Sequence, residues 1–207
     1  MYIPSAFRED DRDALHAILR GAQLVNFVTA TTEGLLATPL PMFLDETEGK
    51  HDVLYGHLAR ANPQWQAAPI GEAIVIAMGP DAYVTPSWYA TKRETGKVVP
   101  TWNYVAVHAY GVPEFFDDAT RLLDVVTRLT SMHEQSREVP WAVTDAPSSF
   151  IQSQLRGIVG IRMPVSRIEG KRKMSQNRSA EDRAGVANGL ASSHSPVDRQ
   201  VANLIPR

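Results

Sequence analysis

The segment YGHLARANPQW, residues 55–65, carries residue types that can bind an anionic group. Gly56 lets the backbone approach a ligand closely, and His57 and Arg60 can donate hydrogen bonds to anionic oxygens. Asn62 precedes a proline and is typical of a helix N-cap, and a helix amino end beside an arginine offers donors suited to phosphate. The alternative is a strand-to-helix turn with an exposed arginine, and spacing alone favours that alternative.

A second segment, residues 80–111, combines aromatic rings with cations. Its members are Trp88, Tyr89, Trp102 and Tyr104, with Lys92, Arg93 and Lys97 between them. Such a set can stack a flat conjugated ring or single-stranded bases, but aromatic residues in strands are more often core. From 102 to 110 the alternate faces read Trp-Tyr-Ala-His-Tyr and Asn-Val-Val-Ala, and neither is plainly polar. This pattern favours a strand covered on both faces, by a barrel interior and by a partner subunit.

A third segment, KRKMSQNRS at 171–179, places three consecutive cations directly after a predicted strand. It could be a nucleic-acid patch, a solvated turn or a pocket for a phosphate. Loops at a barrel rim often carry function, and the Ser, Gln and Asn that follow add neutral donors and acceptors. Three adjacent cations are nevertheless most often a solvated patch, so these residues alone leave the choice open.

The histidines do not form a metal-binding pattern. They are His16, His51, His57, His108, His133 and His194. They show neither His-x-His nor Glu-x-x-His spacing, and there is no cysteine, so we expect no protein-built metal site. A haem iron needs only one histidine. The chain also lacks Gly-x-Gly-x-x-Gly, a phosphate loop and Gly-x-Ser-x-Gly, which gives dinucleotide-fold, kinase and hydrolase interpretations little support.

Short β-type runs separated by Gly, Pro, Asp and Asn clusters must position these residues. We expect strands at 24–31, 34–45, 52–59, 72–79, 82–88, 102–116 and 157–171. We expect helices at 10–20, 117–137 and 147–155, and a short one near 62–68. So many strands with so few helices between them favour a mostly antiparallel sheet closed into a barrel over a parallel α/β sheet.

The carboxyl-terminal segment is predicted to form two further short helices. Each begins at a serine cap, Ser179 and Ser195. The Gly/Ser stretch at 188–195 is the best candidate for a flexible linker between them. We therefore divide the chain into a barrel domain with flanking helices, residues 1–178, and a helical extension, residues 179–207.

Composition limits the partners of the 207-residue chain. The net charge is −2 with both signs interspersed, so there is no overall attraction to nucleic acid or to an anionic membrane, and any DNA contact would be local. There is no apolar run at the amino terminus and no stretch of about 18 apolar residues. Together with the absence of cysteine, these features lead us to expect a soluble, cytoplasmic protein.

Five segments, in order along nearly the whole chain, resemble the PaiB-type FMN-binding negative transcriptional regulators. They are MYIPSAFRE, YGHLARANPQW, YVTPSWY, VPTWNYVAVHAYG and KRKMSQNRSAEDRAGVANGL. Any one of them alone is a weak signal, but five in order are specific. The resemblance implies a mainly β fold with peripheral helices, an FMN-binding split β-barrel similar to that of pyridoxamine phosphate oxidases. It also implies an obligate homodimer with flavin sites at the subunit interface.

The resemblance further implies which residues bind FMN. Those beside the isoalloxazine ring would be Ala37, Thr38 and Pro39. Those holding the phosphate would be Gly56, His57, Leu58, Ala59, Arg60 and Asn62. Those near the ring or the dimer seam would be Trp102 and Asn103. Those of the late segment, acting within their own chain or across the dimer, would be Lys173, Ser175, Gln176 and Asn177. In this interpretation the cations at 171–173 meet the anionic cofactor or a ligand beside it, rather than DNA.

Three functions remain open at this point. The resemblance implies a dimeric flavoprotein acting in negative transcriptional regulation. The second is an FMN-dependent oxidoreductase, or a haem-handling split barrel with His57 or His108 as axial ligand; flavin chemistry needs no catalytic triad. The third is a cofactor-free interaction module. Direct DNA binding has little support, because the helices at 179–205 balance acids with bases and have a long predicted connection.

Overall fold

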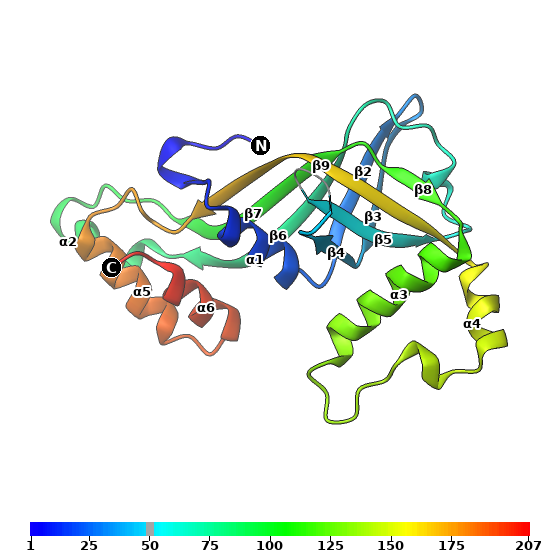
Figure 1. Cartoon of the computed structure of the whole chain (residues 1–207). Helices are drawn as coiled ribbons and strands as arrows, with labels where there is room; N and C mark the ends of the chain where they lie inside the picture. Colours follow the sequence, from blue (N-terminus) through cyan, green and yellow to red (C-terminus); the bar gives the residue numbers. More distant parts are fainter. Residues whose placement is uncertain (49–51) are drawn as a thin grey trace. The chain divides into compact units, whose positions relative to one another are not determined.

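The computed structural model describes residues 1–48 and 52–207, and within them it contains nine strands and six α-helices (Figure 1). The strands are β1 Arg8–Glu9, β2 Val25–Thr31, β3 Gly34–Leu40, β4 Met42–Asp45, β5 Val53–Ala59, β6 Ala73–Val84, β7 Thr101–Gly111, β8 Glu114–Phe116 and β9 Ile158–Lys173. The helices are α1 Arg12–Gly21, α2 Ala90–Thr95, α3 Ala119–Glu134, α4 Ser148–Leu155, α5 Ala180–Ala191 and α6 Pro196–Leu204. Short 3₁₀ turns lie at Ser5–Phe7, Pro63–Trp65, Pro86–Trp88 and Val143–Asp145.

The chain forms two compact units. The terminal unit comprises Met1–Ile18, Met78–Val107 and Glu169–Arg207. The central unit comprises Leu19–Ala77 and His108–Ile168. Strands β6, β7 and β9 contribute residues to both units. The strand order is β3-β2-β6-β7-β9-β5-β4, with β1 and β8 also paired to β9.

The central unit is built on antiparallel strand pairs. Strand β2 pairs with β3 along its whole length and with β6 at residues 26–28, and β5 pairs with both β4 and β9. Alternate residues of β2 point inward and are buried, as expected for a strand with one face on a core. The predicted mainly antiparallel β architecture with peripheral helices is therefore confirmed.

Helix α3 covers part of the central unit. Its buried residues Leu122, Val125 and Leu129 recur at helical spacing and pack in one cluster with Phe43 and Phe116. The side chain of Asp118 caps the helix by accepting a hydrogen bond from Arg121 N at 2.8 Å. Helix α3 contacts β5 and α4, and α4 lies next to it in Figure 1. The predicted helix is confirmed, with somewhat shorter bounds.

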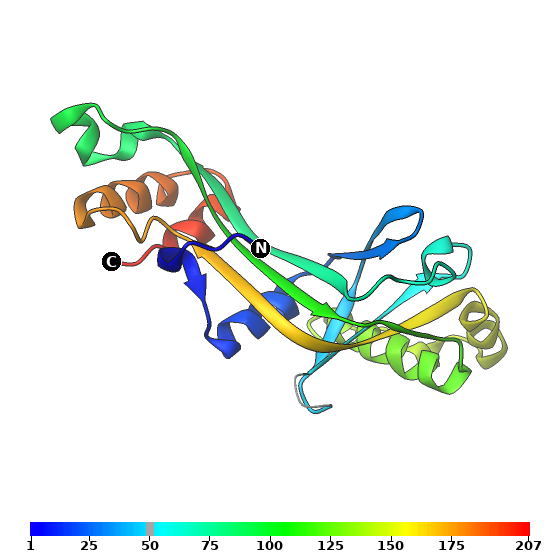
Figure 2. The same ribbon diagram turned by 90° about the horizontal axis from the view of Figure 1, so that it is seen from above.

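The terminal unit has its own core beneath helices α5 and α6, which lie side by side (Figure 2). Val186 and Leu190 of α5 and Val201 of α6 are fully buried and pack with Tyr89 and Met174. Both serine caps are confirmed: Ser179 accepts from Asp182 N at 3.2 Å, and Ser195 accepts from Asp198 N at 3.3 Å.

The predicted linker at 188–195 is correct only for residues 192–195, because α5 continues to Ala191 and α6 begins at Pro196. Gly189, which favoured a flexible segment, is required for helix packing, as is Gly185 before the predicted linker. A Cβ on Gly185 would lie 2.0 Å from Trp88 O, and one on Gly189 would lie 2.3 Å from Trp88 Cε2. The two glycines, one turn apart, thus let α5 lie directly on Trp88.

Three strand predictions also need correction. The run 34–45 divides into β3 and β4 at Pro41, which has no N–H for a strand ladder. The runs 72–79 and 82–88 are joined in β6, with a 3₁₀ turn at 86–88. Gly79, the last residue of the predicted run 72–79, lies inside the longer strand, where a Cβ would approach Val105 Cβ to 3.0 Å. The run 102–116 likewise divides into β7 and β8.

Candidate functional site

A polar network in the central unit joins β2, β3 and the turn after β5. Thr38 Oγ1 donates to Gln64 Oε1 at 2.6 Å and accepts from Asn62 Nδ2 at 2.9 Å. Gln64 is only 1% exposed, and its Nε2 lies within hydrogen-bonding distance of Thr29 Oγ1, Phe27 O and Leu36 O. The network therefore fixes β3, which the resemblance places beside the isoalloxazine ring, against the turn after β5, which the resemblance assigns to the FMN phosphate.

The turn itself begins as a cap. Asn62 Oδ1 accepts from Gln64 N at 2.9 Å and starts the 3₁₀ turn Pro63–Trp65, as its position before proline predicted. The short turn replaces the helix expected near 62–68. Of the strand residues implied by the resemblance, Ala37 and Pro39 are exposed and Thr38 is half-buried, so β3 offers small side chains on its open face.

Gly56 and His57 lie in β5 of the central unit. A Cβ on Gly56 would lie 2.9 Å from both Leu40 Cδ1 and Met42 Cγ, so only glycine allows this close approach. Leu58 is buried and Ala59 is exposed. His57 Nδ1 is buried without a hydrogen-bond partner among the described residues. Burial lowers the pKa of His57 below its ordinary value of 6.5, and the imidazole is neutral at pH 7.

The lowered pKa of His57 predicts a pH dependence of stability. Below about pH 6.5 the unfolded chain takes up a proton that the folded chain still refuses, so stability falls with pH until the lower folded pKa is reached. We expect melting temperatures between pH 7.5 and pH 5 to fall less steeply in His57→Asn than in the natural chain. Equal slopes would show that His57 is not the group responsible.

Arg60 binds the backbone of its own unit. Its Nε donates to Arg156 O at 2.8 Å and its Nη2 to Ile158 O at 3.2 Å, and its Nη1 lies 3.5 Å from Asp117 Oδ2. Arg60 thus ties the turn after β5 to the beginning of β9. The guanidinium remains partly exposed, and its predicted contact with a phosphate stays a prediction.

Replacing Arg60 tests that prediction. We expect Arg60→Ala to weaken FMN binding by about 1–3 kcal/mol, as for the loss of a charged hydrogen bond. Asp117→Asn is the matched control, because it removes the ion-pair partner and leaves the arginine. Fluorescence titration with FMN measures both variants. Unchanged affinity in Arg60→Ala would limit the arginine to a structural role.

The terminal unit brings together the other predicted residues. Ser175 Oγ donates to Asn103 Oδ1 at 3.1 Å, and Lys173 Nζ donates to Trp102 O at 2.8 Å and to Thr101 Oγ1. Ser175 has φ 61°, a left-handed conformation uncommon for residues other than glycine. Segment 171–179 is thus folded against β7 of its own unit.

The two remaining residues of this segment differ in their contacts. Gln176 Oε1 accepts from Met174 N at 2.6 Å, and its Nε2 donates to Arg172 O, so this side chain stabilises the turn. Asn177 is exposed. Burial first, and the charges of Lys171 and Arg178 second, lower the pKa of Lys173 below its ordinary value.

Asn103 stands out among these residues because it is fully buried and incompletely hydrogen-bonded. Its side chain is 0% exposed, and Nδ2 has no hydrogen-bond partner among the described residues. A buried amide donor without an acceptor costs free energy unless a bound group supplies the acceptor. Asn103 is thus a candidate ligand-binding residue with a physical reason.

The aromatic residues separate into two roles. Tyr89 is buried and Trp88 is partly buried, and both pack in the terminal core, as the structural alternative predicted. Trp102 is 52% exposed and lies edge-on to Tyr83, with ring centroids 5.9 Å apart. Of the two faces of β7, the Asn-Val-Val-Ala face is buried, while Trp102 and its alternate neighbours are mostly half-exposed.

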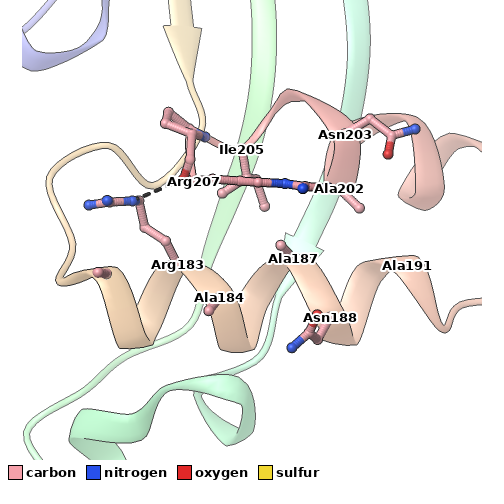
Figure 3. Close-up of a pocket in the computed structure, with 11 residues that line it drawn as sticks. Arg183, Ala184, Ala187, Asn188, Ala191, Ala202, Asn203, Ile205 and Arg207 are labelled. Atoms are coloured by element: carbon pink, nitrogen blue, oxygen red, sulfur yellow. Dashed lines mark hydrogen bonds between the residues drawn. The ribbon is translucent and has the colours of Figure 1, made fainter.

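A pocket of about 660 Å³ lies between α5 and the end of α6 (Figure 3). Five of its lining residues are alanines: Ala180, Ala184, Ala187, Ala191 and Ala202. Arg183 beside it donates from Nε to Pro206 O at 3.0 Å and from Nη1 to Arg178 O at 2.8 Å. These contacts explain the position of Arg183 without a ligand, and we assign none to this pocket.

Two kinds of feature are absent from residues 1–48 and 52–207. These residues contain no cluster of three or more His, Asp or Glu side chains arranged to hold a metal ion. None of their helices is both long and apolar enough to cross a bilayer. His51, one of the histidines considered above, lies outside the described residues.

Sequence reasoning missed Gln64, which makes more contacts in the network than any residue it predicted there. The available signal was the Asn-Pro pair, which predicts a cap at Asn62. The cap stabilises the turn that follows it, and Gln64 lies in this turn, two positions after Asn62. Its inward direction depends on the distant strands β2 and β3, and no local pattern reports that.

Comparison with known proteins is consistent with this geometry. Residues 1–167 match the family described as "Putative FMN-binding domain". The chain is 31% identical over 206 residues to "Protease synthase and sporulation protein PAI 2" of Bacillus subtilis, covering 99% of this chain and 96% of that protein.

Solved structures show the same fold. The FAD and heme binding protein of Mycobacterium smegmatis has a TM-score of 0.58 at 16% identity, covering 86% of this chain and 78% of that one. The flavocytochrome Anf3 of Azotobacter vinelandii has a TM-score of 0.57 at 13% identity, covering 86% and 75%. The expected split-barrel fold is confirmed, and the chain belongs to the PaiB-type family of FMN-binding domain proteins.

Proposed function

We propose that this chain is a homodimeric flavoprotein that binds FMN and acts in negative regulation of transcription. The observation that carries the flavin assignment is the buried donor of Asn103, which has no acceptor among the described residues. An isoalloxazine ring offers carbonyl oxygens and ring nitrogens as acceptors. The family match over residues 1–167 supports the same cofactor class.

Each unit, considered by itself, offers side chains that suit a part of FMN. In the central unit, exposed Ala37 and Pro39 leave room for a flat ring beside β3, and the neutral His57 would meet an anion as a hydrogen-bond donor rather than as a charge. In the terminal unit, Lys173 contributes a cation and Asn103 a neutral donor. When bound, FMN supplies the redox chemistry, and the chain binds and orients it.

Homodimer formation is supported by an apolar surface of the terminal unit. Tyr83 and Trp102 are each about half exposed, at 48 and 52%, and their rings lie edge-on with centroids 5.9 Å apart. Clustered exposed apolar side chains mark interaction sites, and aromatic residues and Met are enriched at protein interfaces. The half-exposed face of β7 fits the sequence-based expectation that a partner subunit covers it.

For regulation, we favour a mode without direct operator binding. The connection between α5 and α6 is only residues 192–195. The sequence analysis expected a long connection and counted it against a helix-turn-helix, and the observed length removes that objection. Charge still does. Arg183 and Arg199 donate to carbonyls of their own unit, and Asp182 is buried, accepting from Thr91 N at 2.9 Å. Duplex-binding surfaces need free cations.

A haem-binding or oxidoreductase role is the second candidate, and His57 is the observation that favours it. A buried neutral imidazole is the form that ligates iron. Two structural relatives are a haem-binding protein and a flavocytochrome, which supports testing haem directly.

Two measurements separate these functions. Anaerobic titration with NADH or NADPH should leave the flavin oxidised if the protein is a regulator, whereas rapid bleaching would favour an oxidoreductase. Light scattering should give the mass of two chains. A monomer that retains flavin would contradict a pocket built at a subunit interface.

A further inference from the structure

A second pocket in the terminal unit has apolar walls, and two of its charged residues, Lys171 and Arg172, directly precede Lys173, which is proposed to hold FMN. Its volume is about 200 Å³, and α1, β7, β9 and the last residue of α6 contribute to it. Apart from three charged residues, its lining consists of Ala14, Leu15, Ala17, Ile18, Val105, Val107 and Leu204. An apolar cavity of about 150 Å³ is large enough to bind benzene.

Two glycines hold α1 on the sheet beside this pocket. A Cβ on Gly170 would lie 2.1 Å from Leu15 Cδ2, and one on Gly79 would lie 3.4 Å from Ile18 Cδ1. Both helix residues line the pocket. The walls are therefore fixed by close packing, and a preformed pocket binds with little ordering cost.

The polar end of the pocket is set by strand register. Glu9 of β1 pairs with Gly170, and Lys171 pairs with Arg8. Because successive residues of a strand face opposite sides, Glu9, Gly170 and Arg172 share the face on which Leu15 packs. Lys171 also lines the pocket, but its ammonium group is already engaged: Nζ donates to Tyr2 O at 3.2 Å and lies 5.3 Å from the Tyr104 ring centroid.

Arg172 is thus the cation at the pocket, and its donors are only partly used. Its Nη2 donates to Leu204 O at 2.8 Å, and its Nη1 lies 3.9 Å from Glu9 Oε2, beyond hydrogen-bonding distance. A guanidinium has five N–H donors in a planar fork that matches a carboxylate. A ligand carboxylate could take up the remaining donors.

We infer that this pocket binds a small apolar acid, with its hydrocarbon body among Leu15, Ile18 and Val107 and its carboxylate at Arg172. A flat or branched acid of about the size of benzoate fits the volume. Glu9 opposes the bound carboxylate and keeps its affinity moderate. Such a site would make the protein respond to the concentration of an organic acid through α1 and β9, two of the elements that line the pocket.

Calorimetric titration of the full chain with benzoate tests the site, with benzyl alcohol as the neutral probe of equal shape. We expect saturable one-to-one binding of benzoate and at least tenfold weaker binding of the alcohol. Ala17 is an exposed lining residue, so Ala17→Phe should block the pocket without disturbing the packing of the core. Ala17→Ser, which adds only a hydroxyl group, is the control. We expect the first to abolish benzoate binding and the second to retain it.

Two charge variants should act in opposite directions, which misfolding cannot explain. Arg172→Gln should weaken benzoate about tenfold or more, and Glu9→Gln should tighten it about two- to fivefold, with neither changing the alcohol. The inference is overturned if benzoate gives no saturable heat, if Ala17→Phe binds as the natural chain does, or if the two charge variants shift affinity in the same direction. Flavin absorbance is recorded in parallel, because failure of the FMN proposal would leave this result unaffected.

Discussion

Replacing Gln64 by leucine should lower the free energy of unfolding by about 3 kcal/mol or more. The side chain is almost fully buried, and its Nε2 and Oε1 together serve four partners. Leucine would leave polar groups of two strands, β2 and β3, without this partner, and each buried group left unsatisfied costs about 1–3 kcal/mol. Gln64→Leu should also weaken FMN binding, because Thr38 loses the side-chain group that positions it.

Urea denaturation of the apoprotein measures the stability effect. Gln66→Leu is the matched control: it lies on the same turn and is exposed, so we expect a change within about 0.5 kcal/mol. A loss below about 1 kcal/mol in Gln64→Leu would mean that the network contributes little, and the strand and turn would then need another explanation for their relative positions.

Replacing Asn103 by leucine should separate ligand binding from stability. The change removes one hydrogen bond with Ser175 and also removes a buried donor that has no acceptor among the described residues. These effects oppose one another, so the apoprotein should change by no more than about 1 kcal/mol. FMN affinity should fall about 10- to 100-fold, because the donor that the flavin would satisfy is gone.

Comparison of the two readouts is decisive for Asn103. Asn188→Leu, an exposed asparagine on α5, is the control and should bind FMN normally. If Asn103→Leu stabilises the apoprotein and leaves FMN affinity unchanged, the residue is only an imperfectly satisfied core group, and the flavin must be held elsewhere.

Local sequence signals predicted those features that are themselves local. Caps at Asn62, Ser179 and Ser195 require only a side chain and a nearby N–H, and all three are present. The face of α3 was similarly readable from its 3.6-residue period.

Features that depend on distant contacts were not predictable in this way. Glycine is typical of turns, but Gly79 lies in a strand and Gly189 in a helix. Glycine is needed at both positions because Val105 and Trp88 occupy the space that a side chain would fill. The FMN-binding residues came from family resemblance and stay predictions. The structure adds a physical reason to expect ligand binding at Asn103 and a structural role for Arg60, which binds backbone carbonyls. It also adds Gln64, which no sequence pattern indicated.

The visible absorption spectrum of the purified protein is the most direct test of the central claim that this chain holds FMN. It should be recorded before and after addition of FMN, and then of hemin, with gel filtration to remove what does not bind. We predict a pair of flavin bands that elute with a dimer and are lost in Asn103→Leu. A Soret band in their place, or no visible band after FMN addition, would contradict the account.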